Sequence, residues 1–188
     1  VIDGTALVTG VLTTTAAAVF NGGFTSNSDT NTFTSENASD PLVIIKNTAN
    51  DASGARLSFQ KDKGANAADG DDIGTITFIG DNNAQEQTNY GSIVVEVSES
   101  QDTDEAGKMS FFVAESNGTA SQLTAGLIIE GEHATDGEVD VTIAAGANST
   151  TTIAGNLAIT SDLTVTGVAN FRNGSVSSPA IRATNDTN

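Results

Sequence analysis

The chain of 188 residues lacks cysteine and tryptophan, and it contains one histidine, one tyrosine, one methionine and two prolines. Without cysteine it can form no disulfide framework, no thiolate metal site and no cysteine nucleophile. A single histidine leaves little material for acid–base chemistry, and no apolar run approaches the roughly 20 residues of a membrane helix. We therefore expect a chain that is not an enzyme, holds no cofactor or metal and does not insert into a membrane.

Basic residues are also scarce, because 7 Lys+Arg stand against 24 Asp+Glu, for a formal net charge of -17. This balance argues against nucleic acid and anionic lipid as partners, since both require a basic surface. The acidity is concentrated in residues 51–140, which hold 18 acids and 4 bases, whereas the rest of the chain holds 6 acids and 3 bases. A distinct acidic central module is therefore predicted.

The central module has the pattern of β-strands, with short alternating apolar runs separated by Gly, Asn and Asp. Ile93, Val95 and Val97 illustrate the two-residue period, which places a set of side chains on one face of a sheet. The predicted strands are Leu42–Lys46, Ala55–Lys61, Ile73–Ile79, Tyr90–Glu99, Lys108–Glu115, Gly126–Glu130 and Val139–Ile143. Seven strands predict an all-β fold containing a small β-sandwich or jelly-roll-like module.

The two flanks, residues 1–35 and 144–178, are poor in charge and rich in Thr, Ala, Gly and Asn. Their apolar pieces are too short to enclose a core within one chain. Such pieces suit thin β-shaft segments in which several copies intertwine around a shared interior, so we expect a homotrimer. The predicted buried shaft residues are Ile153, Leu157, Ile159, Leu163, Val165 and Phe171.

An internal repeat links the two ends of the chain. Residues 12–22 resemble residues 163–174, with matched Leu and Phe positions 151 residues apart. Residues 39–51 and 177–186 also match, and each contains one of the two prolines. Coincidence between low-complexity stretches is the alternative explanation. The repeat predicts an N-terminal shaft segment at 1–35, a sandwich-like module at 36–143, a C-terminal shaft segment at 144–178 and the start of a second repeat at 179–188. We expect a segment of a longer polypeptide or a processed product.

Several stretches between Ser39 and Gly174 resemble tail fibre proteins of tailed bacteriophages, in particular fibres of the marine, cyanophage type. They are Gly74–Gly80, Tyr90–Ile93, Gly107–Phe111, Asp136–Ile143 and the shaft-like Asn156–Gly167. The resemblance implies a homotrimeric structural fibre of the virion that lies outside the cell and carries host recognition. It implies as partners other copies of the chain, neighbouring fibre repeats or virion tail proteins, and a host surface glycan. Whether this segment contacts a receptor or spaces one stays open.

Candidate sites for chemistry are few. Three copies of His133 on a trimer axis would suit a metal ion, although a solvated loop histidine is the simpler interpretation. The acidic turns Asp69–Asp72 and Asp102–Glu105 offer oxygen ligands for Ca²⁺, but they lack the spacing of a calcium loop and are interpreted as solvated turns. A depolymerase would need one carboxylate pair at a fixed separation, and no sequence motif selects such a pair among the 24 acids. We predict no catalytic, cofactor or metal residues.

The strand Lys108–Glu115 is apolar on both sides, with Phe111 and Val113 on one face and Phe112 on the other. We interpret one side as core and the other as a subunit interface. Two alternative functions remain. In a glycan-binding adhesin, the loops Gly64–Asp72 and Asp81–Asn89 would bind a host sugar. In a surface-filament subunit of a microbial cell, copies would join head to tail.

Overall fold

A computed structural model describes residues 14, 17–21, 23–132 and 137–169 of the chain. The chain divides into two units, Val1–Ser58 and Phe59–Asn188. The described residues of the first unit contain neither strand nor helix. No helix occurs in the described part of the second unit either, so neither contains a helix that could cross a membrane. The predicted all-β character is confirmed.

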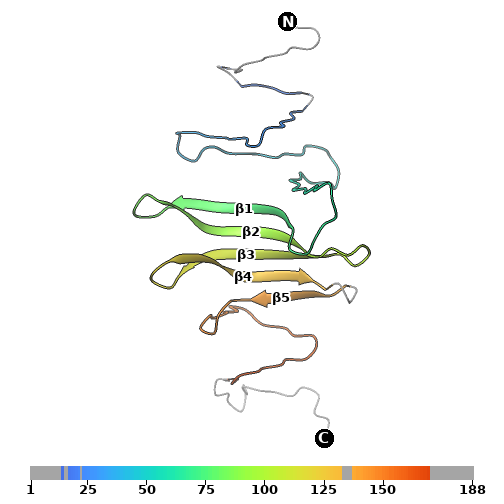
Figure 1. Cartoon of the computed structure of the whole chain (residues 1–188), viewed down its shortest axis with the longest axis vertical. Helices are drawn as coiled ribbons and strands as arrows, with labels where there is room; N and C mark the ends of the chain where they lie inside the picture. Colours follow the sequence, from blue (N-terminus) through green and yellow to red (C-terminus); the bar gives the residue numbers. More distant parts are fainter. Residues whose placement is uncertain (1–13, 15–16, 22, 133–136, 170–188) are drawn as a thin grey trace. The chain divides into compact units, whose positions relative to one another are not determined.

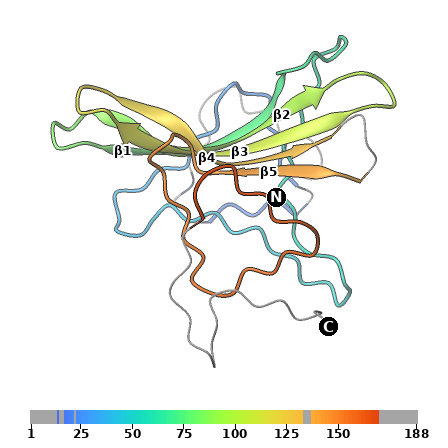
Figure 2. The same cartoon turned by 90° about the horizontal axis from the view of Figure 1, so that it is seen from below.

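The second unit contains one open sheet of five antiparallel strands in the order in which they occur along the chain (Figures 1 and 2). The strands are β1 (Asp72–Asp81), β2 (Gln87–Glu99), β3 (Ala106–Ser116), β4 (Ser121–Gly131) and β5 (Val139–Ile143). Five of the seven predicted strands are therefore confirmed, and β5 has the predicted bounds.

Two predictions were wrong, because Leu42–Lys46 and Ala55–Lys61 form no strand. Both have strand-like composition, yet a strand needs a neighbour that accepts and donates its backbone hydrogen bonds. In the described residues no neighbouring strand pairs with either segment. Their apolar side chains are correspondingly exposed, as for Leu42 at 72% and Leu57 at 65%.

Asparagine side chains shape two of the hairpin turns. In the β1–β2 turn, Asn82 Oδ1 accepts hydrogen bonds from the backbone N–H of Ala84 and Glu86, at 2.8 and 3.0 Å. In the β3–β4 turn, Asn117 Oδ1 accepts from the N–H of Thr119 at 2.9 Å, next to Gly118 with φ of +87°. Asparagine replaces backbone acceptors in tight turns, which explains why the polar segments between the strands reverse the chain.

The strand register places most of the large apolar residues on one face of the sheet. Ile76 lies opposite Ile93, Ile93 opposite Phe111, and Phe111 opposite Leu127. The same face continues onto β5 through Ile143, which pairs with Leu127. We call this surface the apolar face; its members are Ile76, Phe78, Ile93, Val95, Val97, Met109, Phe111, Val113, Leu127, Ile129, Val141 and Ile143.

The opposite face is mixed. Phe112 lies there, so the predicted division of Phe111 and Val113 from Phe112 is confirmed. Ser92 and Ser110, which are 5% and 2% exposed, are buried between the larger residues opposite and beside them.

No hydrophobic side chain is buried among the residues that the structure describes. The described strands form a single layer, so the predicted sandwich or jelly roll, which needs a second layer, is not confirmed. The shaft segments and the trimer remain predictions. Residues 144–169 contain no strand, and Phe171 and 179–188 lie outside the described residues.

Glycine at position 74 lets the segment before β1 approach the sheet. A Cβ atom built on Gly74 would lie 2.8 Å from Cβ of Phe59, which is closer than van der Waals contact allows. We therefore expect Gly74→Ala to displace Phe59 and lower the free energy of unfolding by about 1–3 kcal/mol, the usual cost of overpacking. Urea denaturation monitored by circular dichroism measures the change.

Gly107→Ala is the matched control, because Gly107 shares the face of Gly74 and its added Cβ would lie 3.9 Å from the nearest atom. This variant should be as stable as the parent or slightly more stable, since alanine loses less backbone entropy than glycine. Equal loss of stability in both variants would contradict the proposed contact with Phe59.

Candidate functional site

The apolar face contains a hollow of about 290 Å³ where β1, β2 and β3 lie side by side. Its walls are almost entirely hydrocarbon, with Phe59, Ile76, Val95 and Met109 among them. Ile76 and Met109 are each 39% exposed, so an apolar group placed in the hollow would contact both. An apolar hollow with no convergent polar groups favours a hydrophobic side chain over a polar small molecule.

A second, wider hollow of about 740 Å³ lies at the opposite end of the same face, between β3, β4, β5 and residues 144–151. Val113 and Ile143, each 58% exposed, form its apolar part. Its polar side is Glu115, whose Oε1 accepts hydrogen bonds from Gln122 Nε2 at 2.5 Å and Thr124 Oγ1 at 3.5 Å. One carboxylate with two neutral neighbours provides neither an acid–base pair nor a metal site.

The mixed face carries a row of charges that crosses all five strands. Asp72, Glu96, Lys108, Glu130 and Asp140 stand opposite one another in successive strand pairs, and we call them the charged row. Lys108 Nζ lies 3.1 Å from Glu96 Oε2, and Ser98 Oγ donates a hydrogen bond to Glu130. In two of these strand pairs, β1–β2 and β4–β5, an acid lies directly opposite another acid. Each such pair destabilises the sheet by roughly 0.2–1 kcal/mol.

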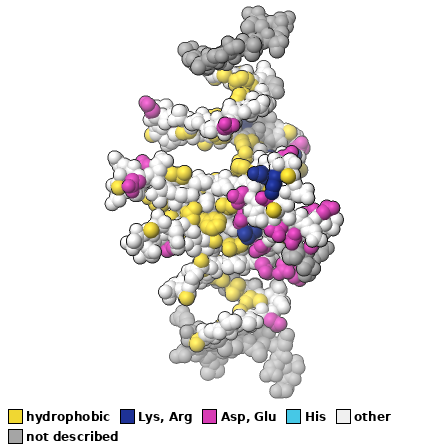
Figure 3. All heavy atoms as spheres, viewed as in Figure 1, with side chains coloured by type: hydrophobic (Ala, Val, Ile, Leu, Met, Phe, Trp, Pro, Cys, Tyr) yellow, Lys and Arg dark blue, Asp and Glu magenta, His cyan; other side chains and the backbone are white. Residues whose placement is uncertain are grey.

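Further acids surround this end of the sheet, where β2 turns into β3 and β4 into β5 (Figure 3). They belong to the adjoining turns and strand ends and include Asp69, Asp71, Glu99, Asp102, Asp104, Glu105, Glu132 and Glu138. The apolar face, in contrast, carries Glu115 at the edge of the wider hollow and is otherwise made of the hydrophobic members named above. The two-residue period thus places most of the charge on one side of the layer and most of the exposed hydrophobic surface on the other.

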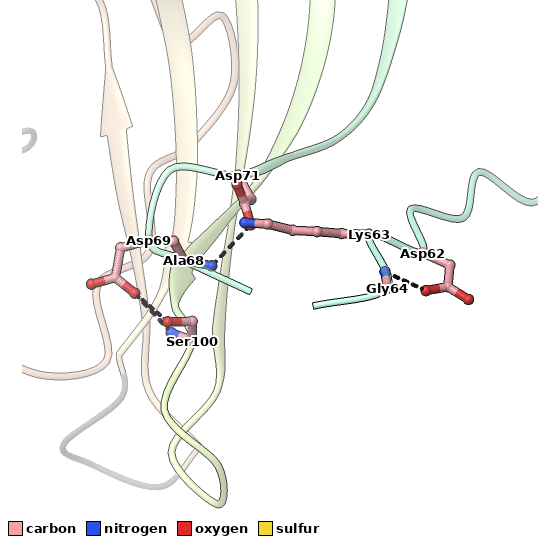
Figure 4. Close-up of polar contacts among 7 residues, drawn as sticks. All are labelled: Asp62, Lys63, Gly64, Ala68, Asp69, Asp71 and Ser100. Carbon is pink, nitrogen blue, oxygen red and sulfur yellow. Dashed lines mark hydrogen bonds and ion pairs between the residues drawn. The ribbon is translucent and has the colours of Figure 1, made fainter. Parts of the chain in front are cut away.

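A polar network ties the segment before β1 to the end of β2 (Figure 4). Lys63 Nζ lies 2.6 Å from Asp71 Oδ2, which also accepts a hydrogen bond from the N–H of Ala68 at 2.9 Å. Asp69 Oδ1 accepts hydrogen bonds from the N–H and Oγ of Ser100, at 2.9 and 2.8 Å. Each of the two carboxylates therefore accepts hydrogen bonds from donor groups of the chain itself.

The hydrogen bond from Lys63 lowers the pKa of Asp71 below its ordinary value. The backbone N–H of Ala68 lowers this pKa further, since both donors stabilise the ionised carboxylate. Desolvation acts in the opposite direction and is the weaker effect.

The structure brings the two predicted acidic turns to the same end of the sheet, because Asp69 bonds Ser100 at the end of β2 and Asp102–Glu105 forms the turn that follows. In the described part of the chain, no three His, Asp or Glu side chains converge as a metal site would require. His133 lies outside the described residues.

The two loops of the glycan-binding alternative are not brought together. Gly64–Asp72 leads into the first residue of β1, whereas Asp81–Asn89 follows from its last residue. A ten-residue strand separates them, or about 30 Å at 3.3 Å per residue. The two loops therefore form no common site on one chain.

Sequence reasoning missed the charged row. Its members are separated by between 10 and 24 positions along the chain, and strand register rather than spacing aligns them. An available signal was the alternating position of these charges, near the start of β1, β3 and β5 and near the end of β2 and β4, because antiparallel pairing brings such positions to the same end of the sheet.

Neither a protein-family model nor a curated protein sequence matches the chain.

The charged row predicts that Lys108 stabilises the sheet by separating two carboxylates. Lys108→Met should lower the free energy of unfolding by about 0.5–1 kcal/mol at low salt, the value of a partly exposed ion pair. Because salt screens the remaining repulsion, the loss should shrink in 1 M NaCl. Urea denaturation at both salt concentrations measures the effect. Lys108→Arg, which keeps the charge, is the control, and a loss independent of salt would contradict the electrostatic explanation.

The lowered pKa of Asp71 predicts a contribution to stability that depends on pH. Because its pKa is lower in the folded chain than in the unfolded chain, the contribution is present above the unfolded value of about 3.9. It is lost as the pH falls through the lower folded value. Asp71→Asn should therefore be less stable than the parent at pH 7 and converge with it in strong acid. Urea midpoints measured between pH 2 and 7 test this, and parallel curves would contradict it.

Proposed function

We propose that this chain is a structural module of a phage tail fibre, forming part of a homotrimeric rod that presents or contributes to host-receptor binding. In this proposal the chain is not an enzyme, and its location is the tail fibre of the virion, outside the cell. Its partners are other copies of itself, adjoining fibre repeats or tail proteins, and a host glycan if the segment touches a receptor.

The observation that carries the proposal is the absence of any buried hydrophobic side chain among the described residues of an all-β chain. A stable fold requires burial of apolar surface to offset the conformational entropy that ordering costs. The strands pair, yet the described part of the chain contributes no second layer of strands to their apolar face. The missing layer in this proposal is another copy of the same chain, so that the sandwich forms between subunits.

A partner that covers one small site would leave most of the apolar surface exposed. Large exposed hydrophobic residues occur before the sheet, within it and after it. Examples are Ile44 at 72%, Phe78 at 56% and Leu157 at 63%. Copies aligned in parallel would supply an apolar counterpart to each of these segments, as a trimeric fibre does and a compact ligand does not.

The stretches that resemble tail fibres support the same proposal by their positions. Gly74–Gly80 lies in β1, Tyr90–Ile93 in β2 and Gly107–Phe111 in β3, so these three segments are neighbours in one sheet. The acidic composition fits an exposed structural protein, because a strong net charge keeps an extended surface soluble.

The proposal predicts the mass of the assembled chain. Light scattering on purified protein should give about 57 kDa, three times the 19.0 kDa of one chain, as for a closed cyclic trimer. The mass should not change on dilution or with a calcium chelator. A stable monomer would contradict the proposal, and polymers that grow with concentration would favour the surface-filament alternative, in which a contact does not close.

A further inference from the structure

The apolar face and the mixed face differ in what they can accept as a neighbour. A chain of net charge -17 repels its own copies wherever acidic surfaces meet. On the mixed face, the charged row would bring Glu96, Glu130 and Asp140 towards the same residues of a second copy. The apolar face largely avoids this cost, because its members are uncharged and its carboxylate, Glu115, lies at the far end beside the wider hollow, where Gln122 and Thr124 hydrogen-bond it. Charge therefore favours contact between copies through the apolar face.

The size of the apolar face fits a stable protein–protein contact. Four strands of 10–13 residues and one of 5 residues, at 3.3 Å per residue and 4.8 Å per strand, cover about 800 Å². A stable interface buries about 800 Å² on each partner. One face of this sheet therefore provides nearly a full interface, without any contribution from the flanks.

The hollows and projecting side chains of the apolar face indicate how a second copy of the chain would pack against it. The 290 Å³ hollow beside Phe59 and Met109 is open to an apolar side chain from outside the chain. Other members of the face project from it, and Phe78, Val141 and Ile143 are each more than half exposed. A surface with both a hollow and projecting side chains can interdigitate with a copy of itself, as close packing requires.

We propose that the apolar face of the sheet is the surface between subunits, packed against the apolar faces of the other copies, with a projecting side chain of one copy in the hollow of another. The mixed face with its charged row then faces solvent. This assignment rests on the proposed oligomeric fibre and adds which side of the sheet lies inside it.

The absence of cysteine makes the test direct, because any introduced thiol is the single one in the chain. Ile76 and Thr77 are adjacent on β1, point to opposite faces and are both exposed in a single chain. The variants Ile76→Cys and Thr77→Cys therefore form a matched pair. Val141→Cys and Thr142→Cys form a second pair on β5, at the other edge of the sheet.

Each variant is reacted with a chromogenic, thiol-specific disulfide reagent, once in buffer and once in urea. The protein concentration is one at which light scattering has established the oligomeric state of that variant. We expect Ile76→Cys and Val141→Cys to react at least about 100-fold more slowly in buffer than in urea, because access requires opening of the assembly. Thr77→Cys and Thr142→Cys should react within about 10-fold of their rates in urea, as solvent-facing thiols do.

The outcomes separate the two proposals. Suppose that an oligomer forms but the thiols of Ile76→Cys and Val141→Cys react as fast as those of Thr77→Cys and Thr142→Cys. The assignment of the apolar face to the interface is then wrong, whereas the proposed oligomer is still supported. If the chain is a monomer, both proposals fail. If Ile76→Cys alone does not assemble, the β5 pair decides, and protection of Val141→Cys but not Thr142→Cys supports the assignment.

Discussion

The apolar face of the sheet needs a cover, and every other property of the molecule depends on this requirement. Backbone hydrogen bonds join each strand of the meander to the next, so that among the described residues only the outer edges of β1 and β5 lack a partner strand. Side-chain burial is far less complete, because no described hydrophobic residue is buried. Covering about 800 Å² at 25 cal/mol per Å² is worth at most about 20 kcal/mol. That value is as large as the whole net stability of a typical domain, about 5–15 kcal/mol, so the cover decides whether the fold persists.

In the proposed fibre, period-two alternation would let a very acidic chain associate with itself. Along β2 and β3, Val95 and Met109 point to one side, while Glu96 and Lys108 point to the other. The same pattern that makes the apolar face places the charged row across the layer from it. In the proposed assembly, carboxylates that repel one another between copies would therefore stay in solvent, where water and salt screen them. An acidic composition and the proposed self-associating surface are compatible because the sheet keeps them apart.

Local pattern predicted much of this sheet, and non-local pairing explains the rest. Val139–Ile143 was predicted with its observed bounds because strict alternation follows Gly137 in a turn. The first half of β4 was missed, since Ser121–Ala125 is mostly polar and joins the strand through the Asn117 turn. Leu42–Lys46 was predicted as a strand from its composition, but among the described residues no strand pairs with it. The charged row depends on register between four strand pairs, which no spacing in the sequence reveals.

The order of the strands also bears on how an assembly would form. In a meander every strand contacts its sequence neighbour, so the sheet needs no long loop closure and forms from local contacts. The described flanks have apolar residues but no strand pairing within the chain. In the proposed fibre the sheet therefore forms first and presents its apolar face, and contact between sheets raises the effective concentration of the flanks for one another. The acidic module would then do more than space the shaft: by aligning the copies, it would lower the entropic cost of intertwining segments too short to pair alone.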